Sequence, residues 1–114
     1  MAENPVTWVY PVLAIDHVHD GDTAMGVEQD LGFHEAAVRT CRLLGINAPE
    51  VGKPGWEAAQ QRLAQLLDLS QHKVVVRTHR LGDFGRDLCT FWSDGVNVNQ
   101  ALLDEGLVVP YRRS

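Results

Sequence analysis

A single helix-like segment lies between two groups of strand-like segments, and this order restricts the fold more than any other feature of the sequence. Its apolar residues recur at steps of three and four, at Trp56, Ala59, Leu63, Leu66 and Leu67. Such a stripe predicts one amphipathic helix, from about residue 54 to residue 69. The apolar residues before and after it are β-branched or alternate with polar ones, which is typical of strands.

Five segments predict strands: 7–15, 23–30, 34–46, 73–81 and 86–93. A tight turn is expected at residues 19–22, with Gly21 at a positive φ between Asp20 and Asp22, and a bend at Leu31 and Gly32. Five strands with a helix between the third and the fourth are the order of an OB-fold, a small closed Greek-key barrel. We therefore expect a mainly β (α+β) fold, a five-stranded barrel with two packed helices.

The second helix is predicted over residues 98–105. Asn97 stands three residues before Gln100, which is the spacing of a capping box, and Gly106 supplies the stop. With 114 residues, the whole chain from 1 to 114 is expected to form one domain.

Charge is distributed unevenly along the chain. Residues 1–38 contain seven acids and no Lys or Arg, whereas residues 39–114 contain ten basic and eight acidic residues, and the net charge is −5. A protein that holds nucleic acid by overall charge is normally basic. Any polyanion is therefore expected to bind at a local site, or together with a cation.

Several apolar and sulfur-containing residues are expected to serve the core. Cys41 and Cys89 do not form a CxxC pair, and both are expected to be reduced structural thiols. Trp56 at the start of the first helix and Phe91 and Trp92 on the last strand are expected in the core rather than as platforms for base stacking.

Oxygen-bearing residues suggest a site for a hard cation. Asp20 and Asp22 flank Gly21, and the loop that contains Asn47 and Glu50 follows the third predicted strand. Calcium takes six to eight oxygen ligands from such groups. Acidic turns are usually just solvated, so spacing alone leaves this interpretation open.

Two arginines add a second requirement of phosphodiester hydrolysis. Arg42 lies on the strand that leads to Asn47, and Arg86 follows a glycine turn. Hydrolysis needs a cation and guanidinium groups to meet the charge on the phosphoryl oxygens, and a carboxylate such as Glu50 to position or deprotonate water. The combination with Asp22 favours a phosphodiesterase, although each arginine alone could simply face solvent.

Five motifs follow one another along the chain: DGDT (20–23), RLLGINAPE (42–50), GWEAAQQRLAQLL (55–67), FGR (84–86) and DGVNVNQALLDEGL (94–107). This series resembles the staphylococcal nuclease (thermonuclease) family over residues 12–111. The resemblance implies an OB barrel and a calcium-dependent endonuclease that cleaves DNA and RNA with little sequence specificity and leaves 3′-phosphate ends.

The resemblance also implies roles for individual residues. Asp22 matches the principal calcium aspartate, and Glu50 matches the carboxylate that orients the attacking water. Arg42 and Arg86 match the pair that grips the scissile phosphate. Tyr111 falls near the family's substrate-side tyrosines.

Four positions bear on how closely the chain follows the family. Asn47 stands where the best-known members have a second calcium aspartate, which predicts weaker calcium binding. Ala48 replaces a threonine whose backbone carbonyl is the ligand, so this change leaves the ligand intact. Asp20 is expected to compensate for the missing negative charge by interacting with the calcium ligands rather than with the ion. Phe84 replaces a tyrosine but keeps a ring face on which a base can stack.

We expect a monomer that acts on single-stranded DNA and RNA and does not bind membranes. The first ten residues lack the features of a secretory signal, so a cytoplasmic protein is expected unless an export signal was trimmed. The alternative is a non-catalytic OB-fold module that binds nucleic acid or protein, which Asn47 favours.

Overall fold

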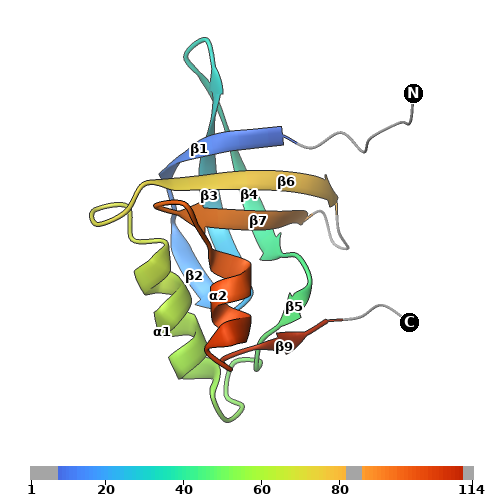
Figure 1. The fold of residues 1–114 in the computed structure, drawn as a ribbon. Coiled ribbons are helices and arrows are strands. Elements are labelled where there is room, and N and C mark those ends of the chain that lie inside the picture. The colour runs from blue at the N-terminus through green and yellow to red at the C-terminus, as the bar shows by residue number, and fades with distance from the viewer. Residues whose placement is uncertain (1–7, 82–85, 112–114) are drawn as a thin grey trace, which may run out of the picture.

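The computed structural model describes residues 8–81 and 86–111, whose strands form a barrel with both helices near one end (Figure 1). The strands are β1 (Trp8–Ala14), β2 (His17–Asp20), β3 (Thr23–Gly32), β4 (Glu35–Leu43), β5 (Ile46–Asn47), β6 (Val74–Leu81), β7 (Asp87–Ser93), β8 (Val96–Asn97) and β9 (Val109–Pro110). The helices are α1 (Trp56–Leu66) and α2 (Val98–Asp104).

Five of the strands close the barrel. The order is β1-β6-β7-β4-β3, and β1 also pairs with β3, which joins the two ends. The β4–β7 pair is parallel and the other pairs in the barrel are antiparallel. The predicted OB-type barrel with one helix between its third and fourth strands is thus confirmed.

The predicted third strand is divided in two. β4 ends at Leu43, the chain turns at Leu44 and Gly45, and the short β5 follows. Gly45 has a φ of 84°, a conformation that glycine adopts at little cost. This corner takes β5 out of the barrel wall and pairs it with β9.

The bend between β3 and β4 was predicted two residues too early. Gly32 pairs with Glu35, so the turn residues are Phe33 and His34, with φ values of 54° and 63°. Two positive φ values are typical of a type I′ hairpin, which normally uses Asn-Gly. The sequence therefore carries no ordinary turn signal at this hairpin.

Gly21 has a different role from the predicted one. It is not among the residues with positive φ. A Cβ atom there would lie 2.6 Å from the Ala59 Cβ and 2.9 Å from the Ala48 Cβ. Glycine is needed because the turn packs closely against α1 and against the loop after β5.

Both helices begin close to the predicted positions. α1 ends at Leu66, earlier than predicted, and buries Ala59, Leu63 and Leu66 against the barrel. At α2, the Asn97 side chain accepts a hydrogen bond from the Gln100 backbone N–H at 3.0 Å. The Gln100 side chain bonds to Asp104 instead of returning to Asn97, so only half of the predicted capping box forms.

The core contains the expected cysteines but only one of the three expected aromatic residues. Cys41, Cys89 and Phe91 are fully buried, and both thiols are free. Trp56 and Trp92 are only half-buried and Trp92 faces outward, so the assignment of both to the core was wrong. No helix in the described part of the chain is long and apolar enough to cross a membrane.

Candidate functional site

One cavity of about 520 Å³ gathers most of the predicted site residues. It is bordered by the β2–β3 turn, β4, the loop after β5 and the residue before β7. Its lining includes Asp20, Asp22, Arg42, Asn47, Ala48, Glu50 and Arg86. The structure thus brings together residues that are far apart in the sequence.

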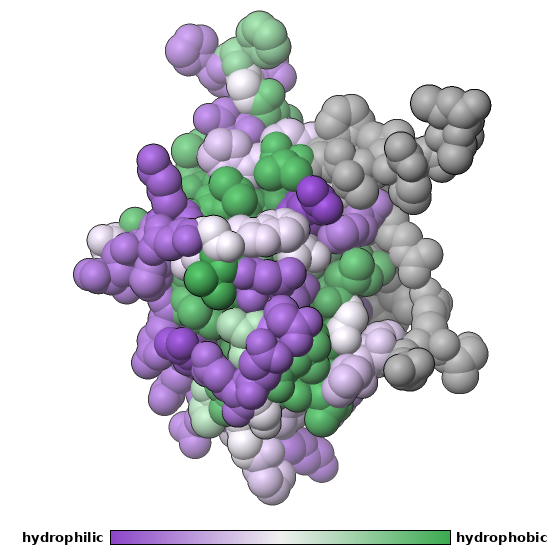
Figure 2. All heavy atoms as spheres, in the orientation of Figure 1, coloured by the Kyte–Doolittle hydropathy of each residue, from purple (hydrophilic) through white to green (hydrophobic). Residues whose placement is uncertain are grey.

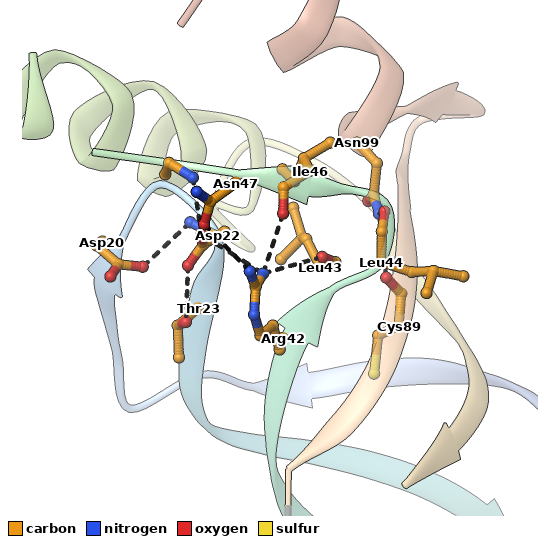
Figure 3. Close-up of polar contacts among 11 residues, drawn as sticks. Asp20, Asp22, Thr23, Arg42, Leu43, Leu44, Ile46, Asn47, Cys89 and Asn99 are labelled. Atoms are coloured by element: carbon orange, nitrogen blue, oxygen red, sulfur yellow. Dashed lines mark hydrogen bonds and ion pairs between the residues drawn. The ribbon is translucent and has the colours of Figure 1, made fainter. Parts of the chain in front are cut away.

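Asp22 lies at the buried wall of the cavity, with 6% of its surface exposed. Its Oδ1 accepts a hydrogen bond from the Thr23 hydroxyl at 3.0 Å, and its Oδ2 accepts one from the Ala48 backbone N–H at 2.8 Å. The same Oδ2 lies 3.4 Å from Nη1 of Arg42 (Figure 3). A buried carboxylate needs such partners, and these three hold it in one orientation.

Arg42 is bonded to the corner between β4 and β5. Its Nη1 donates to the carbonyls of Leu43 (3.3 Å) and Ile46 (3.1 Å), and its Nη2 donates to Oδ1 of Asn47 (3.3 Å). These contacts converge on the guanidinium in Figure 3. The turn that separates β4 from β5 therefore places the carbonyls of Leu43 and Ile46 where they orient Arg42.

Tyr111 contacts Arg42 from the C-terminal segment. The Arg42 Cζ lies 5.3 Å from the centroid of the Tyr111 ring, within the range of a cation–π interaction. The pairing of β9 with β5 and a hydrogen bond from the Tyr111 N–H to the Gly45 carbonyl (2.9 Å) bring the ring there. Tyr111 thus lies beside a site residue, with half of its surface exposed.

Glu50 and Arg86 complete the charged lining of the cavity. Glu50 is exposed and Arg86 is half-buried. Arg86 directly precedes β7, so its position depends on the barrel wall. Phe84, the predicted stacking residue, lies outside the described residues.

Asp20 modulates the charge of the cavity. Its Oδ1 accepts a hydrogen bond from the Asp22 N–H at 3.1 Å. Desolvation by burial, followed by the side-chain interaction and the charge of Asp22, raises the pKa of Asp20 to about 6. The site therefore loses one negative charge in mildly acidic solution.

The oxygen atoms that line the cavity are of the type that binds hard cations such as calcium. Asp22 accepts hydrogen bonds from Thr23 and Ala48 and forms an ion pair with Arg42, and a carboxylate has about four lone-pair sites, so acceptor sites remain for a metal. The Asn47 amide adds a second oxygen. Within the described ranges, no group of three or more His, Cys, Asp or Glu side chains is close enough to hold a metal ion. The donor set thus fits calcium by chemistry but offers little negative charge.

Asn99 is a buried polar residue that the sequence reasoning missed. Its Nδ2 donates to the carbonyls of Leu44 and Cys89, both at 3.0 Å, and its Oδ1 accepts from the Phe91 N–H at 3.2 Å. It joins the β4–β5 corner, which holds Arg42, to β7. The sequence offered one indication that Asn99 is buried: it stands next to the apolar residue Val98 in a short predicted helix.

Comparison with known protein families gives a match to a family model. The family model of staphylococcal nuclease homologues matches residues 40–114, which is more than half of the chain. Arg42, Asn47, Glu50 and Arg86 lie within the matched range, and Asp22 precedes it. Comparison with curated proteins finds no match.

Proposed function

This chain belongs to the family of staphylococcal nuclease homologues, and on that basis we propose that it is a calcium-dependent endonuclease. The family indicates a nuclease or a nucleic-acid-binding function. The more specific proposal is hydrolysis of DNA and RNA phosphodiester bonds with little sequence preference, leaving 3′-phosphate ends.

The observation that carries the proposal is the shared cavity of Arg42, Glu50 and Arg86 with Asp22. A module that only binds nucleic acid needs positive charge, but it has no need for an exposed carboxylate between two arginines. A hydrolase needs both, because water must be activated while charge develops on the phosphoryl oxygens.

Each residue then has a separate part in the reaction. Asp22, Asn47 and the carbonyl of Ala48 would hold calcium, which when bound supplies positive charge to a phosphate oxygen. Glu50 accepts a proton from water as the water oxygen bonds to phosphorus in line with the departing 5′ oxygen. The P–O5′ bond breaks, the 5′ oxygen takes up a proton, and the phosphate stays on the 3′ side.

The arginines act on the substrate phosphate. Arg42 and Arg86 donate N–H groups to its oxygens as negative charge increases there. Arg42 is already oriented by two carbonyls, which lowers the cost of positioning it during the reaction.

The substrate is proposed to be single-stranded, and the protein to act as a monomer. A shallow cavity at a barrel surface accepts splayed bases more readily than a stiff duplex. Tyr111 and Phe84 are proposed to contact the substrate.

A non-catalytic binding module is the second candidate, and Asn47 is the feature that favours it. An amide in place of a carboxylate removes one negative charge from the calcium ligands. If calcium binding is too weak to support hydrolysis, the same arginines still bind phosphate.

Degradation of heat-denatured DNA, with calcium or with a chelator, separates the two candidates. The nuclease proposal predicts calcium-stimulated degradation that falls at least about 100-fold in Glu50→Gln. Glu57→Gln is the matched control, because Glu57 is an exposed glutamate on α1 outside the cavity lining. Binding without cleavage at every calcium concentration would instead support the module.

A further inference from the structure

Among the described side chains, the outward face of β6 and β7 carries an arginine, a histidine and a tryptophan and no carboxylate. In β7, residues 87, 89, 91 and 93 are buried, while Leu88, Thr90 and Trp92 between them are half-buried and face outward. In β6, Val75 pairs with Trp92 and Arg77 pairs with Thr90, so they share this face. We call the set Val75, Arg77, His79, Leu88, Thr90 and Trp92 the β6–β7 face.

The acid in these two strands points the other way. Asp87 is 8% exposed, lies on the inward side of β7 and pairs with Arg39 at 2.8 Å. Asp94, in the turn after β7, bonds to the ring of His72 and to the Lys73 N–H. The Asp87 carboxylate is therefore turned away from the β6–β7 face, and the Asp94 carboxylate lies at the end of β7, where it is engaged in hydrogen bonds.

The outward face of β3 has the opposite character. Glu28 and Asp30 are half-buried there. In a chain of net charge −5, the β6–β7 face is thus the wall of the barrel that suits a polyanion.

Arg77 and Trp92 form a stacked pair on this face. The Arg77 Cζ lies 5.3 Å from the centroid of the Trp92 ring, and Arg77 is exposed. Beside them, the His79 Nε2 lies 2.9 Å from the Thr90 hydroxyl. Nucleobases stack on aromatic rings and on guanidinium planes, so the outer side of this pair can accept a base.

The β6–β7 face is continuous with the cavity. Leu88 pairs in register with Arg42, which lines the cavity, and Arg86 immediately precedes β7. Trp92 lies six residues beyond Arg86, or about 20 Å along an extended strand. β6 and β7 lie side by side (Figure 1), so a nucleic-acid strand that leaves the cavity along β7 would pass Arg77 and Trp92.

We propose that the single-stranded substrate extends from the cavity across the β6–β7 face and stacks a base on the Arg77–Trp92 pair. This inference rests on the proposed function, because the position of the scissile phosphate sets where the strand begins. It makes Arg77 and Trp92 determinants of affinity for long substrates, outside the group that acts on the phosphate.

Binding in a Glu50→Gln background tests the path without cleavage. Fluorescence anisotropy is measured in calcium with labelled single-stranded oligonucleotides of three and twelve nucleotides. Adding Arg77→Gln is expected to weaken binding of the twelve-nucleotide strand by about 5- to 50-fold. The three-nucleotide strand, with an internal phosphate in the cavity, has at most two nucleotides on the side of β7 and does not reach the pair, so its binding should change less than about twofold.

Two further variants test whether the loss is specific to the stacked pair: one removes a charge elsewhere, and the other removes the aromatic ring. Arg62→Gln removes one positive charge from α1, where Arg62 pairs with Glu105, and should not show the length-dependent loss. Trp92→Leu should reproduce the effect of Arg77→Gln, provided that its thermal unfolding shows it to be folded. Equal losses for both lengths, or equal losses in Arg77→Gln and Arg62→Gln, would overturn the proposed path.

Failure of the path is distinguishable from failure of the nuclease proposal. If the unaltered protein cleaves DNA with calcium but Arg77→Gln shows no length-dependent loss of binding, the path alone is wrong. If the protein does not cleave but the length-dependent loss is found, the path holds for a binding module.

Discussion

The paired strands β3 and β4 reach the cavity at one end and an exposed hairpin tip at the other, and the two ends differ in how they are held. At the cavity, Thr23 pairs with Arg42, and the neighbouring Asp22 has a partner for each carboxylate oxygen. At the tip, Phe33 and His34 have positive φ values, and Phe33 is 97% exposed. The tip projects from the body of the protein and carries hydrophobic residues among hydrophilic ones (Figure 2).

The comparison shows that this pair of strands concentrates its side-chain contacts where charges must be oriented. Left-handed backbone costs about 1–2 kcal/mol for a residue other than glycine. At the tip this cost is not offset by burial of Phe33, whereas at the cavity Arg42 and Asp22 are fixed by hydrogen bonds from three segments. Substitutions at the cavity should therefore impair function, and substitutions at the tip should change stability alone.

The largest effect is expected for Arg42→Ala. It removes a donor to the substrate phosphate and the ionic partner of Asp22, so the rate of calcium-dependent cleavage should fall by at least about 100-fold. Initial rates on denatured DNA measure this loss. Arg62→Ala, which breaks an exposed pair on α1, should stay within about twofold of the unaltered protein.

Gly21→Ala should have the largest effect on stability. The new Cβ would meet Ala59 and Ala48 inside ordinary contact distance, and such overpacking typically costs about 1–3 kcal/mol. Urea unfolding of Gly21→Ala, Ala59→Gly and the double variant measures the coupling. The double variant should be more stable than the sum of the two single changes predicts, and strict additivity would contradict the close approach.

Replacing the hairpin turn by Phe33→Asn with His34→Gly should stabilise the protein. Asn-Gly suits two positive φ values, so the free energy of unfolding should rise by about 1 kcal/mol with no change in cleavage. Phe33→Ala is the control, because it removes the exposed ring but keeps the backbone cost. An equal gain from Phe33→Ala would attribute the effect to the ring instead.

The last effect concerns the pH dependence of stability at Asp20. Its pKa is raised to about 6 in the folded protein, so the folded state binds the proton more tightly than the unfolded state. The stabilisation is fully present below the ordinary pKa near 3.8 and is lost as the pH rises to about 6. In chelator, Asp20→Asn should lack this loss between about pH 4 and pH 6, as measured by urea unfolding. An unchanged pH profile would contradict the shift.

The sequence predicted the barrel because its signals were local. The helical stripe of Trp56–Leu66 and the alternation in β7 follow from single segments. The turn at Phe33 and His34 could not be predicted, because neither residue normally occupies a type I′ turn. The role of Gly21 was also missed, since its packing against Ala59 depends on contacts that only the folded chain makes.

The residue types that line the cavity could be predicted from the sequence, but their hydrogen bonds could not. The motif around Asp22 and the loop at Glu50 indicated a cation and a carboxylate. The orientation of Arg42 depends on the turn at Gly45 and on Asn99. Neither contribution could be predicted, because the sequence indicated one continuous strand at this turn. The Arg77–Trp92 pair was missed because an aromatic residue on a late strand is typical of the core.

The central claim is that Glu50 and the arginines act on one phosphodiester bond. A double-mutant cycle with Glu50→Gln and Arg86→Lys, measured as kcat/KM on a single-stranded oligonucleotide in calcium, tests it directly. Each single change should lower kcat/KM strongly, and the double change should lower it much less than the product of the two losses, because residues that act as a unit are not additive. Losses that multiply, or a Glu50→Gln protein that cleaves at the unaltered rate, would contradict the account.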